Sequence, residues 1–185
     1  MTLKILSGKF KGKSINVPQT DSVRPILTRL RKSLLDTIRN ELNGASFLDL
    51  FGGSGSVTFE ALSNGVRFAT IVELDRINFQ TIRKNARLLG LSSQVEIVHG
   101  DAINKIKKFY QQNRKFDFIY IAPPQYLGLI NRAFDQLSKN RIYHPETLII
   151  TQCHPKEKID ALSSKFYLLK SRRHGNTTLD YYRIK

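Results

Sequence analysis

The stretch from residue 46 to residue 75, SFLDLFGGSGSVTFEALSNGVRFATIVELD, constrains the fold more than any other part of the sequence. Ser46–Phe51 is a short apolar run, which is typical of a strand buried on both faces. A glycine-rich turn follows, then a segment from Ser56 with helical character, then a second apolar run over Phe68–Leu74 with Glu73 near its end. This order predicts a strand, turn, helix and strand, in which the glycines let a ligand approach the backbone closely.

The turn in this unit suits a nucleotide-type ligand that carries no phosphate. A dinucleotide fingerprint, G-x-G-x-x-G/A, that starts at Gly53 continues to Gly55 and then meets Thr58, so its third position fails. Asp49, just before the glycines, would repel a phosphate and attract an ammonium group. S-adenosylmethionine has an ammonium group, a sulfonium and a ribose but no phosphate. We therefore interpret Asp49 as facing the methionine end and Glu73 as accepting hydrogen bonds from the ribose; the alternative is a glycine-rich turn in another α/β protein.

Composition limits the class of protein and its partners. The 185 residues suffice for one domain with a sizeable core. Thirty Lys and Arg against 15 Asp and Glu give a formal net charge of +15, for which a polyanion is the natural partner; the alternative is a charge that serves only solubility. A single cysteine, Cys153, excludes an internal disulfide and a cysteine-based zinc site, and we expect no metal. Without a secretory signal or an apolar run of membrane length, we predict a cytoplasmic protein with no membrane contact.

A basic hairpin is predicted at the start of the chain, over residues 1–20. Its turn region carries Lys9, Lys11 and Lys13 around Phe10. Cations that alternate with an aromatic residue suit a phosphate backbone and a stacked base. The alternative is a solvated hairpin tip with Phe10 packed inward.

A helix is predicted over residues 28–42, where apolar residues recur every four positions at Leu30, Leu34, Ile38 and Leu42. Cations crowd its entrance, namely Arg24, Arg29, Arg31 and Lys32. Because cations at a helix N-terminus oppose the helix dipole, we interpret them as an anion-binding group. The alternative is a solvated basic face.

Two further strands are predicted at Gln94–Val98 and Lys115–Ile121, after a helix over Asp75–Leu89. Asp101 follows the first of these strands, on the ligand side of a parallel sheet. It can accept a hydrogen bond from an adenine amine, or act as the N-cap of a helix over residues 102–112, or do both.

The second of these strands runs directly into Ala122-Pro123-Pro124-Gln125-Tyr126. Two prolines cannot donate to a central strand ladder, so they predict a rigid loop whose free carbonyls can accept hydrogen bonds from a ligand, with Tyr126 available to stack on a base. The alternative is a structural turn into a helix over residues 127–138. Beyond it we expect a strand at Thr147–Thr151, a short helix at His154–Ser163 and a closing hairpin.

This order of parts resembles the class I S-adenosylmethionine-dependent methyltransferases. More closely, it resembles the RsmD-type family of small-subunit ribosomal RNA guanine-N2 methyltransferases, over nearly the whole chain. The motifs that carry the resemblance are KILSGKFKGKSI, RPILTRLRKSLLDTI, FLDLFGGSGSVTFEALSNG, IVELDR, HGDA, IYIAPPQY and HGNTTLDYYR. The glycine turn and the acids are common to the superfamily, whereas the second and last motifs are more specific.

The resemblance implies an α/β, Rossmann-like three-layer sandwich with a seven-stranded, mostly parallel sheet whose last strand is antiparallel. Residues 1–43 would form an RNA-gripping hairpin and helix, and residues 44–185 the S-adenosylmethionine-binding methyltransferase domain. The implied activity is methyl transfer to the exocyclic N2 of a guanine in small-subunit (16S) ribosomal RNA. The partner would be that RNA or the assembling small subunit, and we expect a monomer.

The resemblance also implies roles for individual residues. The cofactor site would comprise Asp49, Phe51, Gly52, Gly53, Ser54, Gly55, Glu73, Leu74, Asp101 and Ala102. The RNA phosphates would be gripped by Lys9, Phe10, Lys11, Lys13, Arg24, Arg29 and Arg31. The catalytic loop would be Ala122, Pro123, Pro124, Gln125 and Tyr126.

The catalytic loop departs from the family pattern, which is Asp-Pro-Pro followed by Phe or Tyr. Ala122 stands where the family has Asp, and Gln125 takes the place of the aromatic residue. The guanine amine is a weak nucleophile that must be oriented, so we expect the Ala122 and Pro123 carbonyls and the Gln125 amide oxygen to accept its hydrogen bonds. The alternatives are an RNA-binding assembly factor with little catalysis, or an amino-methyltransferase acting on DNA adenine or protein. The net charge argues against most protein substrates.

Overall fold

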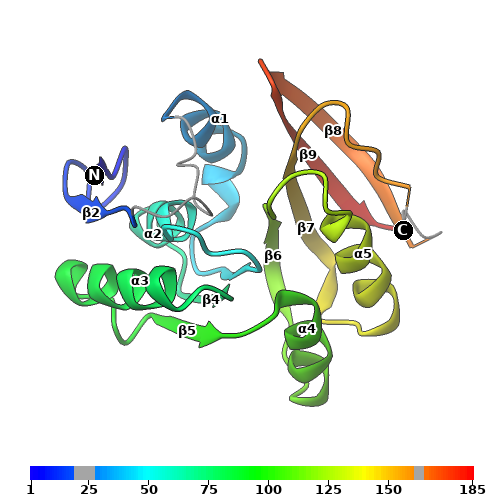
Figure 1. Cartoon of the computed structure of the whole chain (residues 1–185), viewed down its shortest axis with the longest axis horizontal. Coiled ribbons are helices and arrows are strands. Elements are labelled where there is room, and N and C mark those ends of the chain that lie inside the picture. The colour runs from blue at the N-terminus through cyan, green and yellow to red at the C-terminus, as the bar shows by residue number, and fades with distance from the viewer. Residues whose placement is uncertain (19–27, 161–164) are drawn as a thin grey trace. The chain divides into compact units, whose positions relative to one another are not determined.

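The computed structural model describes residues 1–18, 28–160 and 165–185. These residues divide into two compact units, Met1–Gly100 and Asp101–Lys185. Strands β3 to β9 form a seven-stranded sheet, in the order β5-β4-β3 within the first unit and β6-β7-β9-β8 within the second (Figure 1). The predicted α/β class with a seven-stranded, mostly parallel sheet is therefore confirmed.

The first unit contains a two-stranded sheet and three strands of the seven-stranded sheet. Its elements are β1 (Thr2–Lys4), β2 (Ser14–Asn16), α1 (Thr28–Ile38), the 3-10 helix η1 (Arg39–Glu41), β3 (Ser46–Asp49), α2 (Ser56–Ser63), β4 (Phe68–Glu73), α3 (Arg76–Leu89) and β5 (Val95–His99). β3 and β5 both pair in parallel with β4, which lies between them. Because the strands are parallel, Asp49 and Glu73 both lie at the carboxyl edge of this part of the sheet.

The predicted N-terminal hairpin is present and packs on the rest of the first unit. β1 and β2 pair antiparallel. The Asn85 side chain of α3 accepts from the Asn16 amide and donates to the Asn16 carbonyl, both at 2.8 Å. Gly8 has a φ of 77°, and a Cβ there would lie 1.9 Å from the Ser63 carbonyl oxygen. Only glycine allows the hairpin to approach α2 this closely.

The second unit carries the C-terminal part of the sheet. Its elements are α4 (Ala102–Gln111), β6 (Phe116–Ile121), α5 (Leu129–Lys139), β7 (Tyr143–Cys153), β8 (Phe166–His174) and β9 (Thr177–Ile184). β6 and β7 are parallel, and β9 runs antiparallel to both β7 and β8. The predicted closing hairpin and the antiparallel last strand are thus confirmed. Figure 1 shows α4 and α5 packed side by side.

Two predictions in the second unit were wrong in detail. The strand predicted at Thr147–Thr151 extends over Tyr143–Cys153. The helix predicted at His154–Ser163 is absent over residues 154–160, and residues 161–163 lie outside the described residues. Pro155 lies in a turn directly after this long strand, and residues 157–160 form no regular structure.

Cys153 is 2% exposed, and burial raises the pKa of its thiol to about 12, with the charges of Asp180 and Glu157 adding to the rise. Cys153 is therefore an ordinary buried thiol. In the part of the chain that the structure describes, no helix has the length and apolar character needed to cross a membrane.

Candidate functional site

Asp49 is the last residue of β3, and the protein encloses its carboxylate. The residue is 1% exposed. Its Oδ1 accepts a hydrogen bond from the Phe51 amide at 3.2 Å, and its Oδ2 accepts one from the Thr58 hydroxyl at 2.9 Å. Burial raises the pKa of the Asp49 carboxyl to about 7; the hydrogen bonds from Thr58 and Phe51 oppose this rise and the charge of Glu73 adds to it. A cation beside Asp49 would stabilise its ionised form.

The glycine turn after β3 is held by backbone hydrogen bonds. The Gly52 amide donates to the Val72 carbonyl at 2.9 Å, and the Gly55 amide donates to the Gly52 carbonyl at 2.7 Å. A Cβ at Gly55, where φ is 75°, would lie 2.7 Å from the Phe59 ring. A Cβ at Gly53 would have no heavy atom within 4 Å. The turn is therefore open at Gly53, where a ligand can approach the backbone.

Glu73 ends β4 and connects its carboxylate to this turn. Its Oε2 accepts from the Gly53 amide and its Oε1 accepts from the Asp75 amide, both at 2.7 Å. Burial raises the pKa of the Glu73 carboxyl, and the hydrogen bonds from Asp75 and Gly53 oppose this rise. A carboxylate has about four acceptor sites, so Glu73 keeps capacity for ligand hydroxyls. Leu74, the next residue, is 66% exposed and offers an apolar surface beside it.

The cofactor residues predicted in the first unit lie on one turn and the end of the neighbouring strand. They are Asp49, Phe51, Gly52, Gly53, Ser54, Gly55, Glu73 and Leu74. Neither the turn nor residues 73–75 contain a lysine or an arginine. The Glu73 carboxylate, the turn amides and the opening at Gly53 fit a ligand with a ribose, and they do not fit a pyrophosphate. A contact between the buried Asp49 carboxylate and an ammonium group stays a prediction.

Asp101 and Ala102 belong to the second unit. The Asp101 carboxylate accepts a hydrogen bond from the Asn104 amide at 2.8 Å, so the predicted N-cap role is confirmed. Ala102 is the first residue of α4 and is 5% exposed. Asp101 is partly exposed and has acceptor capacity left, and its contact with an adenine stays a prediction.

The loop predicted to be catalytic follows the carboxyl end of β6. Pro123 is buried, whereas Ala122 and Gln125 are partly exposed. Tyr126 is 62% exposed, and its φ of 65° lies in the left-handed region that non-glycine residues rarely adopt. Its ring lies 5.2 Å from the ring of His154, measured between centroids. The loop thus presents an aromatic ring to solvent, next to the partly exposed Gln125.

The hairpin cations are exposed, but the aromatic residue between them is not. Lys9, Lys11 and Lys13 are exposed. Phe10 is only 8% exposed, its amide donates to the Ser63 hydroxyl at 2.9 Å, and the ammonium groups of Lys9 and Lys13 lie 5.7 and 5.1 Å from its ring centroid. The predicted base-stacking role of Phe10 is therefore corrected, because its ring packs inward as the alternative stated.

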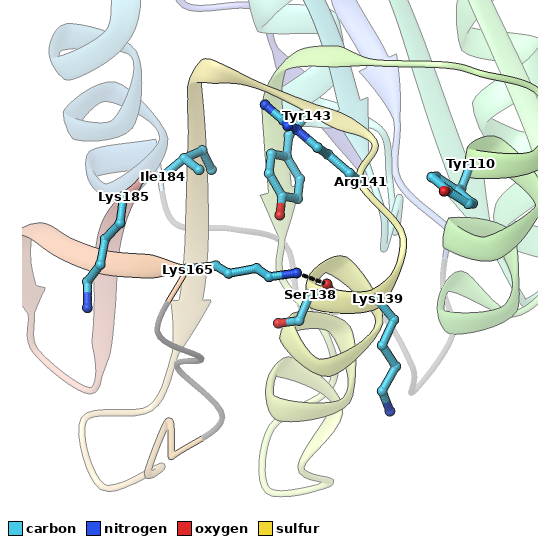
Figure 2. A pocket seen from close by; sticks show the side chains of 8 residues that line it. All are labelled: Tyr110, Ser138, Lys139, Arg141, Tyr143, Lys165, Ile184 and Lys185. Carbon is cyan, nitrogen blue, oxygen red and sulfur yellow. Dashed lines mark hydrogen bonds between the residues drawn. The ribbon is translucent and has the colours of Figure 1, made fainter.

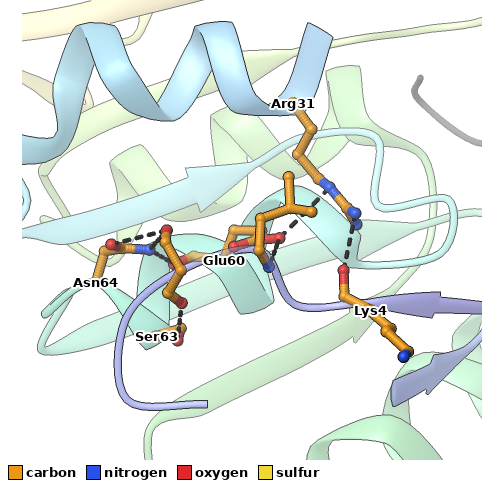
Figure 3. A network of polar contacts seen from close by, with 7 residues as sticks. Lys4, Arg31, Glu60, Ser63 and Asn64 are labelled. Atoms are coloured by element: carbon orange, nitrogen blue, oxygen red, sulfur yellow. Dashed lines mark hydrogen bonds and ion pairs between the residues drawn. The ribbon is translucent and has the colours of Figure 1, made fainter. Parts of the chain in front are cut away.

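Arg31 is buried, which corrects its predicted role at the RNA surface. The residue is 1% exposed, and its Nε lies 3.4 Å from Oε1 of the fully buried Glu60. Its Nη2 donates to the Lys4 carbonyl at 2.9 Å, and the Leu6 amide donates to Glu60 Oε1 at 2.7 Å. Figure 3 shows Arg31 reaching from α1 toward Glu60 on α2 and toward the hairpin. Arg31 joins three segments of the first unit, and no phosphate can reach it.

Two further arginines, Arg24 and Arg29, were predicted to contact RNA. Arg29, in the first turn of α1, is exposed and remains a candidate. Arg24 lies outside the described residues.

Comparison with known proteins assigns the chain to a family. The profile of the family described as "Conserved hypothetical protein 95" matches residues 3–183. The chain belongs to this family. A Haemophilus influenzae protein named ribosomal RNA small subunit methyltransferase D is 28% identical over 181 residues, which cover 97% of this chain and 93% of the relative.

Solved structures agree with this membership. A proposed methylase from Haemophilus influenzae is 27% identical, with a TM-score of 0.82 over 99% of this chain and 98% of the other. A proposed methyltransferase from Escherichia coli has the same fold, with a TM-score of 0.87 at 24% identity over 100% of this chain and 99% of the other. The resemblance to the RsmD-type family is thereby confirmed.

Three residues that contact predicted site residues were not predicted from the sequence. Thr58 donates to Asp49 from within α2. The His99 Nε2 lies 2.9 Å from the Leu74 carbonyl oxygen and ties the end of β5 to the end of β4. His154 packs on Tyr126. The contacts of His99 and His154 join distant parts of the sequence, whereas Thr58 lies nine residues from Asp49 and contacts it across the glycine turn.

Proposed function

We propose that this protein transfers a methyl group from S-adenosylmethionine to the exocyclic N2 of a guanine in small-subunit ribosomal RNA. Membership of the family, and the name of the Haemophilus influenzae relative, support the reaction class and the RNA. The net charge of +15 supports a polyanionic substrate.

The observation that best supports the proposal is the hydrogen bond that the Gly53 amide donates to the Glu73 carboxylate. It places an acid with spare acceptor capacity next to the open position of the glycine turn. This is the arrangement that a ribose with two hydroxyls requires, and it lacks the cations that a phosphate would require.

Each residue predicted from the sequence has its own proposed contact with the cofactor. Asp49 would neutralise the ammonium group, and Glu73 would accept from the ribose hydroxyls. Leu74 would contact the adenine ring, and Asp101 with Ala102 would bind its edge. When bound, S-adenosylmethionine supplies a methyl group on a sulfonium, whose C–S bond breaks as the bond to guanine N2 forms.

In the catalytic loop, the chain's own groups would orient the amine and accept its hydrogens. Ala122 has no side-chain acceptor, so the acceptors would be the Ala122 and Pro123 carbonyls and the Gln125 amide oxygen. Pro123 and Pro124 limit backbone motion in this loop, which favours a fixed geometry. A strong general base is not required, because the amine becomes acidic once methylated and its proton can then leave to water. Tyr126 would stack on the flipped base.

Exposed cations of the first unit would bind the RNA backbone, namely Lys9, Lys11, Lys13 and Arg29. We propose either free small-subunit ribosomal RNA or an assembling small subunit as the substrate. Either substrate would place the protein in the cytoplasm. The expected monomer stays a prediction.

The pKa of Asp49 makes cofactor binding depend on pH. Because an ammonium group needs the ionised carboxylate, affinity for S-adenosylhomocysteine should fall about tenfold per pH unit below a pKa of about 7 and level off above it. Calorimetry from pH 5.5 to 7.5 measures this change in affinity. In this pH range the α-amino group of the ligand stays charged, because such groups titrate at about pH 8. Asp49→Asn should bind weakly with a shallower profile. If the affinity of the parent protein depended on pH no more steeply than that of Asp49→Asn, the proposed contact between Asp49 and the ammonium group would be contradicted.

The same shift affects stability in the absence of ligand. The folded pKa of Asp49, about 7, lies above its ordinary value of 3.8, so the unfolded chain releases this proton first. The contribution of protonated Asp49 to the free energy of unfolding is therefore lost as pH rises from about 4 to 7. The Asp49→Asn variant, which has no proton to release, should unfold at a higher temperature than the parent at pH 8.

The decisive assay for the proposal is transfer of labelled methyl to small-subunit ribosomal RNA that lacks the modification, both free and in partly assembled subunits. We expect label on one guanine N2. Gln125→Ala should lower kcat by about 10- to 100-fold, because one acceptor for the amine is lost, and should leave cofactor affinity unchanged. Gln125→Glu, which retains the acceptor oxygen, should retain more activity than Gln125→Ala.

Two results would separate the alternatives. Cofactor binding with no transfer to either substrate would contradict the catalytic proposal and favour an RNA-binding assembly factor. Transfer to DNA adenine but not to RNA would favour an amino-methyltransferase of another substrate class.

A further inference from the structure

A pocket of about 250 Å³ in the second unit is lined mainly by polar and basic residues. Its lining residues are Tyr110, Ser138, Lys139, Arg141, Tyr143, Lys165, Ile184 and Lys185. Four of them are cations and none is an acid. Figure 2 shows these side chains coming from the end of α4, the end of α5, the segment that leads into β7, the residue before β8 and the end of β9.

The pocket lies at the opposite edge of this unit from the catalytic loop. Phe116 and Tyr143 are partners at the starts of the parallel strands β6 and β7. Ile184 ends the antiparallel strand β9 and therefore lies at this same amino edge. Ala122 follows the other end of β6, which spans six residues or about 20 Å. The pocket is thus separate from the candidate catalytic loop.

Two of the cations have structural partners. The Lys139 ammonium lies 2.7 Å from the Asp135 carboxylate, and the Lys165 ammonium donates to the Ser138 carbonyl at 2.6 Å (Figure 2). Both positions also offset the negative end of the α5 dipole. These contacts explain why Lys139 and Lys165 occur here without any ligand.

Arg141 is different. It is exposed, and its guanidinium lies 5.8 Å from the ring centroid of the buried Tyr143. Within residues 1–18, 28–160 and 165–185 it forms no ion pair with a carboxylate. A guanidinium that is oriented by an aromatic face and left without a carboxylate is well placed to bind a phosphate through two parallel hydrogen bonds.

An exposed aromatic ring accompanies this cation. Tyr110 on α4 lines the pocket and is 47% exposed. An aromatic face next to cations is the arrangement on which single-stranded nucleic acids stack their bases while the backbone is neutralised. A pocket for a small inorganic anion would not need this ring.

We propose that this pocket is a second RNA site, in which Arg141 binds a backbone phosphate and Tyr110 stacks on a base of a single-stranded segment outside the target nucleotide. The inference rests on the proposed function for the identity of the RNA. It extends that function by assigning the RNA a contact at the amino edge of the second unit, in addition to the hairpin cations of the first unit.

The test measures binding of a fluorescently labelled small-subunit ribosomal RNA fragment by anisotropy over a range of salt concentrations. Arg141→Gln should weaken binding about fivefold and reduce the slope of log affinity against log salt by about one. Tyr110→Ala should weaken binding about tenfold with the slope unchanged, because a stacking contact releases no counterion. Lys84→Gln, which removes an exposed cation from α3 outside the pocket, is the matched control and should change neither quantity as strongly.

Arg141→Lys separates a phosphate contact from an effect on the fold, because it keeps the charge and should restore the salt slope. Parental affinity and slope in both Arg141→Gln and Tyr110→Ala would overturn the proposal. Methyl transfer and cofactor calorimetry on the same preparations keep the two proposals distinguishable. Loss of RNA affinity in these variants supports the second site even if the parent transfers no methyl, and normal RNA affinity in them contradicts it even if the parent is active.

Discussion

Glu73→Ala is expected to weaken binding of S-adenosylhomocysteine by about 100-fold and to abolish methyl transfer at ordinary cofactor concentrations. The substitution removes the proposed acceptor for the ribose hydroxyls. It also leaves the Gly53 and Asp75 amides without the carboxylate oxygens that accept from them at 2.7 Å. The open turn would then lose its support from β4 at the position where the ligand approaches. Calorimetry with the purified protein measures the affinity directly.

A matched control for this prediction is Asp36→Ala. It also removes one carboxylate from the first unit, but Asp36 is exposed and pairs with Arg39 on the surface. Such pairs contribute little to stability, so the control should bind the ligand like the parent. If Glu73→Ala bound S-adenosylhomocysteine with the parental affinity, the cofactor site would have to lie elsewhere in the protein.

Arg31→Met is expected to lower the free energy of unfolding by about 3–5 kcal/mol. The change leaves the Glu60 carboxylate fully buried with no cation beside it, and it removes the donor to the Lys4 carbonyl. Burial already raises the pKa of the Glu60 carboxyl, against the hydrogen bond from Leu6 and the charge of Arg31. Urea denaturation monitored by circular dichroism measures the loss.

The double variant Arg31→Met with Glu60→Leu tests the cause of that loss. Because it removes both charges and fills the space with apolar groups, it should recover most of the stability. A surface role for Arg31 in RNA binding predicts a different result: little loss of stability in Arg31→Met, together with a shallower salt dependence of RNA binding. That outcome would contradict the structural role assigned to Arg31.

Local patterns in the sequence determined much of the fold and part of the site. The apolar runs around the glycine turn led to β3, α2 and β4, and Asp101 was recognised as an N-cap because its partner amide lies three residues away. The glycine turn with its acids also indicated the kind of cofactor. These features depend on neighbours within one or two turns of chain, which periodicity and residue type describe well.

Tertiary structure alone decided which side chains are available for binding. Arg29 and Arg31 look alike in the sequence, yet one is exposed and the other is paired with Glu60 inside the first unit. Likewise, Phe10 is an aromatic residue between lysines whose ring packs inward, and the pocket with Arg141 gathers residues from segments far apart in the chain. Whether a charge or a ring faces solvent depends on which distant residues pack around it. The cost of burying a charge is offset only when the fold supplies a partner, and no local pattern contains that information.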